Sequence, residues 1–543
     1  MFCLQQKRGT MKKTGNLIAF LLPGLCLLLL VFLNLFYQDH WLDSDMAAEM
    51  IFSKLLSESH HVFATTEWYY STEFRFLYTQ LLMGPLFGLT NDWHLIRTIT
   101  NLVFYGLMLT SYFYFVKPLK ISGRLSALIS VILLLPFSET MMTHMQMGNT
   151  YLSHVIISFL FFGMFLRLVD KVRYKFAYRC VTAVFYVVLS FICGVSGVRY
   201  LLALQCPLVL ASFLYLLKSQ ELQSFRREMH RELISPIFTC SQAAYFGYSL
   251  LGAVSGVVGY GVNVLWVSKN YVFQTYGATN FISIYQGILF ERLQNAIGCL
   301  LMLFGYIPDR GFLSLRGVIS MTSFLLLSVF VYCTVKVLHS AKGVRYFVTL
   351  FLTVAFWLNM FVFVFTTSTM VPRYYITILI FALPVLAFYV ESEKCKLDKV
   401  TMGLLLGVCL LLGTGKTVLS FITVDKNEDK RAVAEFLEDN GYTFGFATYT
   451  NANIITELTE GAVEIANVGD PKYLEYFRWS SSVRYYQEGY HEGETFLLLT
   501  AEEAAKFGDT QAVTEGMNVY EDGNYVVLVY ESVDALMDCA EER

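Results

Sequence analysis

Long hydrophobic runs recur along the first 424 residues, and a short polar segment separates each run from the next. A helix needs about twenty apolar residues to cross the hydrocarbon core of a membrane. We therefore expect a polytopic α-helical membrane protein with about eleven membrane-spanning helices. The expected spans lie near residues 17–37, 95–116, 125–140, 150–168, 180–196, 198–217, 233–260, 317–338, 346–367, 374–390 and 400–422.

Two further apolar stretches fit poorly as spans. The stretch at 76–89 is short and contains Gly84-Pro85, and the stretch at 288–306 carries Glu291-Arg292 among its apolar residues. Both are more typical of juxtamembrane helices that lie in the outer interface of the membrane. Either could instead form half of a re-entrant pair, so the pattern allows about two spans more or fewer.

The periodicity changes after residue 424. Shorter alternating segments follow, with a helix expected at 429–440, closed by Gly441, and another near 501–507. Strands are expected near 443–450, 494–500 and 524–530. The pattern predicts a small α/β domain. The chain thus divides into a membrane domain, residues 1–424, and a soluble tail domain, residues 425–543.

Composition and charge support this division. The chain is 55% hydrophobic and only 15% charged, against about 25% charged residues in ordinary soluble domains. Its net charge of -3 conceals a strong asymmetry, because the tail domain holds 25 Asp and Glu against 8 Lys and Arg. The tail is therefore acidic, and the loops of the membrane domain are basic.

The basic residues of the membrane domain occur in alternate loops, which the positive-inside rule places in the cytoplasm. The first span is preceded by Lys7, Arg8, Lys12 and Lys13 and lacks a small-x-small cleavage site, so it resembles an uncleaved signal anchor. We expect a multi-pass protein of the cell membrane with a cytoplasmic N-terminus and an extracytoplasmic tail domain. The first outer loop would cover about residues 38–94.

The acidic cluster Asp43-Ser44-Asp45 lies in this first loop. Carboxylates beside a membrane are costly unless a cation or proton donor meets them. Asp45, and with it Asp43, is a candidate general base for an acceptor hydroxyl. The two could also hold a divalent cation, Mg²⁺ or Mn²⁺, together with a substrate phosphate. Either aspartate could instead cap a helix that begins near Met46.

Cations are rare on the expected outer side. Arg199, Lys269 and Arg373 are candidates for holding the phosphate of a lipid-linked sugar donor, although Arg373 could simply anchor the end of a helix. The segment that contains Trp68, Tyr69 and Glu73 combines aromatic faces with an acid, which suits a sugar pocket. Aromatic residues also gather at membrane interfaces for packing alone, so both interpretations stay open.

These features together resemble the type C glycosyltransferase superfamily, which includes protein O-mannosyltransferases and lipid A aminoarabinose transferases. The similarity lies in the acidic first loop, Gly84-Pro85-Leu86-Phe87, Arg97 and the late element Val371-Pro372-Arg373-Tyr374-Tyr375. It implies an inverting membrane enzyme that moves a sugar from a polyprenyl-phosphate donor to an extracytoplasmic glycan, lipid or protein of the cell envelope. By the same resemblance, the superfamily's catalytic first-loop carboxylate corresponds to Asp45 or Asp43, and Arg373-Tyr374 binds the donor.

The sequence departs from the superfamily pattern at two places. Asp45-Met46 stands where an Asp-Glu pair is usual, and Gly-Pro-Leu replaces Pro-Pro-Leu. A catalytically silent protein of the same fold is therefore one alternative, and a transporter or lipid flippase is another. A transporter would place ionisable residues near the membrane midplane, whereas most charges here lie in loops.

Metal and nucleotide motifs are incomplete. The segment Gly413-Thr414-Gly415-Lys416-Thr417 imitates the end of a P-loop but lacks its first glycine and sits in a membrane helix. His60-His61, His144 and His154 are too scattered to predict a zinc site. We expect no nucleic-acid partner and no tightly bound cofactor beyond the divalent cation considered above.

Overall fold

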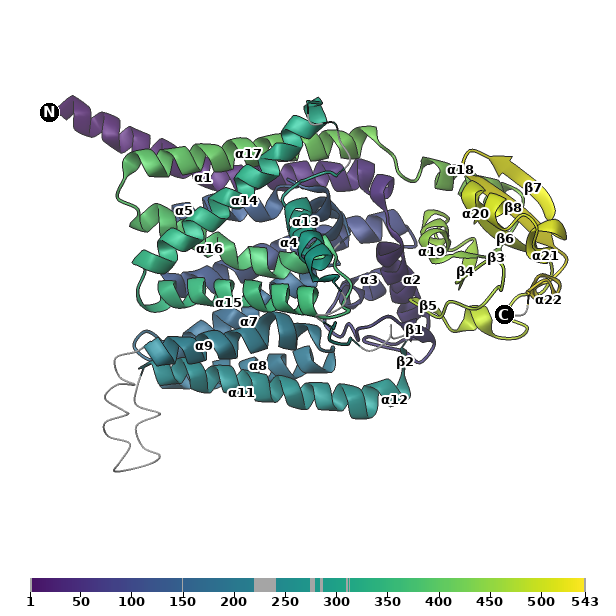
Figure 1. Cartoon of the computed structure of the whole chain (residues 1–543), viewed down its shortest axis with the longest axis horizontal. Helices are drawn as coiled ribbons and strands as arrows, with labels where there is room; N and C mark the ends of the chain where they lie inside the picture. Colours follow the sequence, from purple (N-terminus) through teal and green to yellow (C-terminus); the bar gives the residue numbers. More distant parts are fainter. Residues whose placement is uncertain are drawn as a thin grey trace.

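The computed structural model shows a helical bundle with a separate tail domain at one end, and the N-terminus lies at the other end (Figure 1). The structure describes residues 2–148, 150–218, 241–273, 279–283, 287–308, 311 and 313–541. In the described residues, ten helices are long and apolar enough to cross a membrane, and one bent pair would make eleven. The chain is a multi-pass membrane protein, as its hydrophobic pattern predicts.

The bundle helices run roughly alongside one another in Figure 1. The spans at the centre of the bundle belong to α7 and α16, because 83% of each span's most apolar window is buried. The elements of the bundle are α1 (Phe2–Tyr37), α4 (Trp93–Val116), η2 (Lys117–Leu119), α5 (Gly123–Leu134), α7 (Leu152–Val169), α8 (Phe176–Val195), η4 (Leu201–Gln205), α9 (Cys206–Lys218), α11 (Ser241–Val262), η6 (Asn263–Val267), α14 (Leu315–Ser340), α15 (Gly343–Phe365), α16 (Ile376–Ser392) and α17 (Lys396–Thr423).

One expected span differs in shape. The run at 125–140 ends as a helix at Leu134, and the chain bends by 92° before α6 (Glu139–Met141) and the π-helix η3 (Met142–Met147). Pro136 explains the break, because proline disfavours helical geometry in the residue before it and donates no backbone hydrogen bond. Residues 233–240 of the expected span at 233–260 lie outside the described residues, and the candidate span there is Gln242–Asn270.

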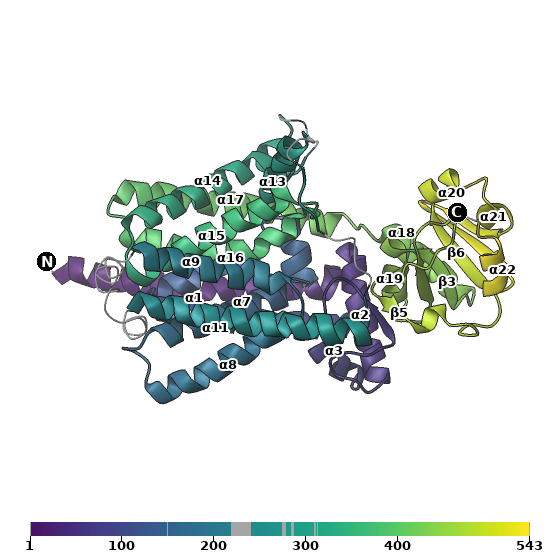
Figure 2. The same ribbon diagram turned by 60° about the horizontal axis from the view of Figure 1, so that its bottom comes forward.

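Short elements lie between the bundle and the tail domain (Figures 1 and 2). The expected juxtamembrane helices at 76–89 and 288–306 appear as α3 and α13, and neither is among the candidate spans of the described residues. These connecting elements are η1 (Gln38–Trp41), α2 (Ser44–Glu58), β1 (Trp68–Tyr70), α3 (Gln80–Phe87), α12 (Ser268–Asn270), β2 (Val272–Phe273) and η8 (Pro372–Tyr375), whereas α13 (Leu289–Leu303) packs against α15 of the bundle.

The tail domain contains a five-stranded mixed sheet in the order β4-β3-β6-β8-β7. The strands β3, β4 and β6 are parallel, and β6, β8 and β7 pair antiparallel. The expected strand at 443–450 ends at Thr448, because Tyr449 already begins a helix. The elements are α18 (Glu428–Asp439), β3 (Phe444–Thr448), α19 (Tyr449–Leu458), β4 (Glu464–Val468), β5 (Ser481–Ser482), η9 (Arg484–Tyr486), β6 (Thr495–Thr500), α20 (Ala501–Lys506), α21 (Gln511–Thr514), β7 (Met517–Asp522), β8 (Tyr525–Tyr530) and α22 (Val533–Asp538).

A second, three-stranded sheet joins the tail domain to two membrane-domain loops. Its order is β2-β1-β5, so one strand comes from the first loop, one from the loop after α11 and one from the tail domain. Trp68 pairs with Ser482, and Tyr69 pairs with both Ser481 and Val272. Backbone hydrogen bonds therefore hold three distant parts of the chain in register.

A buried ion pair also joins the tail domain to the membrane domain. Arg97 of α4 donates to Glu457 of α19 at 2.6 to 2.8 Å, and the same guanidinium reaches the Met46 carbonyl at 3.0 Å. Arg97 is 1% exposed and Glu457 is 7% exposed. Because each buried charge needs its partner, the pair fixes where α19 rests on the bundle.

Removal of the Glu457 carboxylate tests this interface. Glu457→Ala leaves Arg97 buried without a counter-charge, which typically costs about 3 to 5 kcal/mol. We expect a lower unfolding temperature in detergent and faster proteolysis of the tail domain than in the wild type. Glu438→Ala is the matched control, because Glu438 is an exposed glutamate of the neighbouring α18. Equal stability of both variants would show that the pair does not hold the domain.

The orientation of the bundle can be tested by cysteine labelling. Exposed Cys395 lies between α16 and α17 in a basic loop that we expect in the cytoplasm, and exposed Glu502 lies on α20 of the tail domain. In a Cys395→Ser background, Glu502→Cys should react with a membrane-impermeant maleimide on intact cells. Native Cys395 should react only after permeabilisation. The reverse pattern would place the tail domain in the cytoplasm.

Candidate active site

A cavity lies where α2, the segment after β1 and the tail domain meet. The space in it that a water-sized molecule can occupy is about 40 Å³, so the cavity is narrow. Acidic and basic side chains share its wall with aromatic ones, which is the mixed lining expected of a polar ligand site. We call it the acid cavity; its lining residues include Asp45, Glu49, Trp68, Glu73, Arg75 and Ser480.

Helix α2 presents two carboxylates to this cavity. Asp43 caps the helix, with its side chain accepting the Met46 backbone N–H at 2.9 Å. Asp45 and Glu49 follow within α2, and residues four apart lie on the same face of a helix. The cap that one interpretation of the sequence predicts is therefore present at Asp43, and Asp45 remains directed toward the cavity.

Asp45 is held by one proton donor and one cation. The Tyr449 hydroxyl donates to its Oδ1 at 2.7 Å, and Nη1 of Arg373 lies 3.5 Å from its Oδ2. Burial alone would raise the pKa of Asp45, but nearby Arg75 and Arg373 outweigh burial and the pKa is lowered. Asp45 is therefore a carboxylate at neutral pH and can accept a proton.

Asp43 titrates differently from Asp45. Burial, and then the negative charge of Asp45, raise the pKa of Asp43 to about 6. Two neighbouring acids whose pKa values move apart suit different roles, since one stays ionised while the other binds a proton near neutral pH. This favours Asp45 over Asp43 as the group that accepts a proton from substrate.

Glu49 and Arg75 are residues that the sequence interpretation missed. Nη1 of Arg75 contacts Glu49 Oε1 at 2.7 Å, and the Thr79 hydroxyl donates to Glu49 Oε2 at 3.0 Å. Burial raises the pKa of Glu49 to about 7 despite the nearby arginine. Glu49 could have been predicted from the sequence, because it follows Asp45 by four residues and so lies on the same face of the helix. Arg75 lies in an irregular segment after β1, and its place as a cation in the expected first outer loop was a signal that the sequence interpretation did not use.

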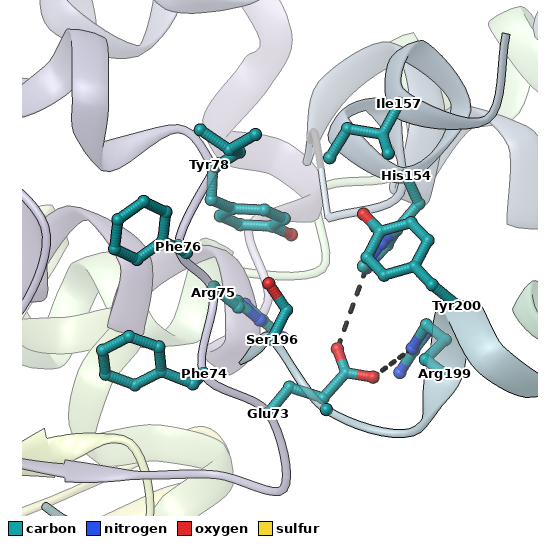
Figure 3. Close-up of a pocket in the computed structure, with 12 residues that line it drawn as sticks. Glu73, Phe74, Arg75, Phe76, Tyr78, His154, Ile157, Ser196, Arg199 and Tyr200 are labelled. Carbon is teal, nitrogen blue, oxygen red and sulfur yellow. Dashed lines mark hydrogen bonds and ion pairs between the residues drawn. The ribbon is translucent and has the colours of Figure 1, made fainter. Parts of the chain in front are cut away.

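A smaller pocket adjoins the acid cavity and shares Glu73 and Arg75 with it (Figure 3). Figure 3 shows Glu73 between Arg199 and His154; Arg199 makes a hydrogen-bonded ion pair with Glu73, and His154 Nε2 lies 3.8 Å from its Oε2. Burial would raise the pKa of Glu73, but Arg199 and His154 lower it. We call this the Glu73 pocket.

Three of the four candidate donor-binding residues lie in this region. Arg199 lies over the rings of Tyr151 and Tyr374 at 5.1 and 5.3 Å from their centroids. Arg373, the neighbour of Tyr374, reaches Asp45. In contrast, Lys269 is exposed on α12 and lines neither the acid cavity nor the Glu73 pocket.

The candidate sugar-pocket residues separate across strand β1. Trp68 is 4% exposed and lines the acid cavity, as Glu73 does. Tyr69 points to the opposite face, because successive residues of a strand alternate. Its ring packs on Tyr486 at 5.6 Å, and Arg478 lies over it at 5.7 Å. Tyr69 thus contacts the tail domain rather than the cavity.

Asp43 and Asp45 are poorly arranged to bind a divalent cation, because their oxygens already have other partners. The Asp45 oxygens face Tyr449 and Arg373, and Asp43 bonds a backbone amide. A cation there would compete with a guanidinium for the same carboxylate. In the part of the chain that the structure describes, no three His, Cys, Asp or Glu side chains converge as a metal site. The metal role of the two aspartates stays a prediction.

Comparison with known proteins supports the fold. No protein-family model and no curated protein matches the chain. The structure is similar to the crystal structure of ArnT from Cupriavidus metallidurans bound to undecaprenyl phosphate, with a TM-score of 0.53 and 13% identity over 96% of this chain and 99% of that chain. Arabinofuranosyltransferase AftD from mycobacteria matches at a TM-score of 0.30 and 11% identity, covering 82% of this chain and 32% of its own. The likeness to ArnT shows a type C glycosyltransferase fold, which confirms the resemblance at the level of fold.

Proposed function

We propose that this protein is a membrane glycosyltransferase that moves a sugar from a polyprenyl-phosphate donor to an extracytoplasmic hydroxyl acceptor. The observation that carries the proposal is the placement of Asp45 beside Arg373 at 3.5 Å, at the edge of the acid cavity. Such a pair supplies the two groups the reaction needs, a base for the acceptor and a cation for the departing phosphate.

The chemical step follows from these two groups. Asp45 accepts the proton of the acceptor hydroxyl while that oxygen attacks the anomeric carbon of the sugar. The bond between the anomeric carbon and the phosphate oxygen breaks, and its electron pair leaves with the lipid phosphate, where Arg373 stabilises the charge. Attack from the face opposite the phosphate inverts the anomeric configuration. The acceptor would be a glycan, lipid or protein of the cell envelope.

The surroundings of the site support a lipid-linked donor. An apolar cavity of about 420 Å³ lies between the first loop, α8 and α11, and its wall includes Phe63, Phe191 and Trp266. It shares Phe74 and Phe76 with the Glu73 pocket. A polyprenyl chain in this apolar cavity would leave its phosphate close to the arginines. The similar ArnT structure contains undecaprenyl phosphate.

The arginines differ in their availability to a donor phosphate. Arg199 is engaged by Glu73, and Arg75 by Glu49. Arg373 has the longer contact, 3.5 Å to Asp45, and its side chain is 32% exposed. A phosphate could therefore bind Arg373 without breaking a close ion pair such as Arg199–Glu73 or Arg75–Glu49. We assign the direct phosphate contact to Arg373 and place Arg199 and Arg75 as supporting charges.

The first test removes the proposed base. Asp45→Asn should lower sugar transfer by roughly 10²- to 10⁴-fold, the usual contribution of general base catalysis. Asp43→Asn should lower transfer as much or less. The measurement is transfer by purified protein from a panel of polyprenyl-phosphate sugars to envelope acceptors.

Asp92→Asn is the matched control for Asp45→Asn. Asp92 is an exposed helix cap of α4, and asparagine caps equally well. Unchanged transfer in the Asp43 and Asp45 single variants and in the double variant would eliminate the first-loop mechanism. Movement of intact donor across liposome membranes without loss of its sugar would favour a flippase instead.

The second test concerns donor binding by Arg373. Loss of one charged hydrogen bond costs about 1.5 to 3 kcal/mol, or roughly 10- to 150-fold in affinity. Arg373→Ala should weaken binding of a polyprenyl-phosphate sugar by this amount. Arg373→Lys should weaken binding less than Arg373→Ala does, because lysine keeps the positive charge. It should still bind less tightly than the wild type, because an ammonium lacks the two parallel donors of a guanidinium.

Lys269→Ala provides the comparison for Arg373, since exposed Lys269 lies outside the acid cavity and the Glu73 pocket. We expect this variant to bind donor nearly as well as the wild type. Equal binding by the wild type and both Arg373 variants would leave Arg373 as a helix anchor only. A loss confined to Lys269→Ala would move the phosphate site toward α12.

A further inference from the structure

The tail domain contributes directly to the acid cavity. Ser480 of this domain lines the cavity, and the Tyr449 hydroxyl donates to Asp45. Tyr449 is the first residue of α19, immediately after the parallel strand β3. Its position at the carboxyl end of a parallel strand is a common place for functional side chains in mixed α/β sheets.

Several buried contacts fix the position of Tyr449. The Arg97–Glu457 pair holds α19 against α2, and Ile454 packs in one apolar cluster with Met46. The Tyr449 ring itself meets Phe477 edge to face at 5.9 Å between centroids. Because helix and ring are both held, the hydroxyl is pre-organised toward Asp45.

We propose that Tyr449 is a positioning residue, supplied by the tail domain, that keeps the Asp45 carboxylate ionised and oriented toward the acceptor hydroxyl. This inference rests on the proposed function, because it assigns a role within that reaction. The hydroxyl occupies Oδ1 of Asp45, which leaves Oδ2 on the side of Arg373. The tail domain thereby becomes part of the catalytic apparatus.

Other charged groups surround Asp45 but cannot replace this contact. They are Arg75 after β1, Arg373 of η8, and the acids Asp43 and Glu49 at either side on the first loop. His144 of η3 also faces Asp45, but burial lowers the pKa of its imidazole to about 3, so it is neutral. Arg373 is the group that we expect to turn toward the donor phosphate, and Arg75 is bound to Glu49. Tyr449 is neutral, so an arriving phosphate attracts it less, and its bond to Asp45 can persist through the reaction.

The protonation state of Tyr449 suits this role. Burial, and then the charge of Asp45, raise the pKa of Tyr449 well above its usual value. Its hydroxyl therefore remains a donor throughout the physiological pH range. A hydrogen bond to the charged form of an acid lowers the pKa of that acid, so removal of the bond raises the pKa of Asp45.

Tyr449→Phe is the direct test, because it removes the hydroxyl and keeps the ring. We expect kcat about 10- to 100-fold lower with donor KM unchanged, since a misoriented base slows chemistry without weakening binding. The acidic limb of the pH–rate profile should move upward by roughly half to one pH unit. A purely structural role would leave that limb in place.

Tyr490→Phe is the matched control. Tyr490 donates to Glu464 at 2.6 Å, so this variant also loses a tyrosine–carboxylate hydrogen bond of the tail domain. It should keep the wild-type kcat and pH–rate profile. If Tyr449→Phe and Tyr490→Phe both behave like the wild type, the positioning role of Tyr449 is overturned. A fall in kcat at Tyr449→Phe without a shift of the acidic limb would also contradict it.

A readout independent of transfer separates this inference from the proposed function. A hydrophobic carbodiimide modifies protonated carboxyl groups, and mass spectrometry can follow its reaction at Asp45 as a function of pH. The midpoint should lie at higher pH in Tyr449→Phe than in the wild type and in Tyr490→Phe. If the wild type transfers no sugar yet this midpoint shifts, the proposed reaction fails while the Tyr449–Asp45 contact stands. Identical midpoints in all three proteins would refute the contact.

Discussion

The pairing of carboxylates at the end of the membrane bundle is the constraint on which this structure depends. An acid removed from water is costly unless a cation or donor meets it, and here four such acids each meet an arginine, in three cases one from a distant part of the chain. The pairs are Asp45 with Arg373, Glu49 with Arg75, Glu73 with Arg199, and Glu457 with Arg97. Together these contacts bring the first loop, the helix ends and the tail domain to one place.

The hydrophobic pattern was sufficient to predict the spanning helices, because span length depends on membrane thickness and little else. It missed the bend after Leu134, where Pro136 interrupts a run whose hydropathy is continuous. In the tail domain, strands β4 and β7 of the five-stranded sheet were not foreseen. Strand β7 is an edge strand with mostly exposed residues, so it lacks the apolar alternation by which strands are recognised, whereas β4 is a mostly buried run of only five residues.

The candidate site was predictable only in part. Asp45 stood out as part of an acidic cluster, and Arg373 because cations are scarce on the expected outer side, but Lys269 satisfied the same criterion as Arg373 and lies away from both cavities. Charge and expected side identify which residues could contribute, whereas tertiary packing decides which ones meet. Tyr449 could not be predicted from the sequence, since nothing in its local sequence indicates a contact with Asp45, about 400 residues away.

The arrangement also explains why the tail domain is integral to the site. The membrane domain alone would leave Arg97 without Glu457, Asp45 without the Tyr449 hydroxyl, and strand β1 without β5. Each loss exposes a group beside the acid cavity or leaves it without a partner. A buried polar group without a partner destabilises a protein by more than a formed hydrogen bond stabilises it. The first loop therefore depends on the tail domain for its order. The proposed reaction at Asp45 would then be coupled to correct docking of a domain whose sequence begins 380 residues later.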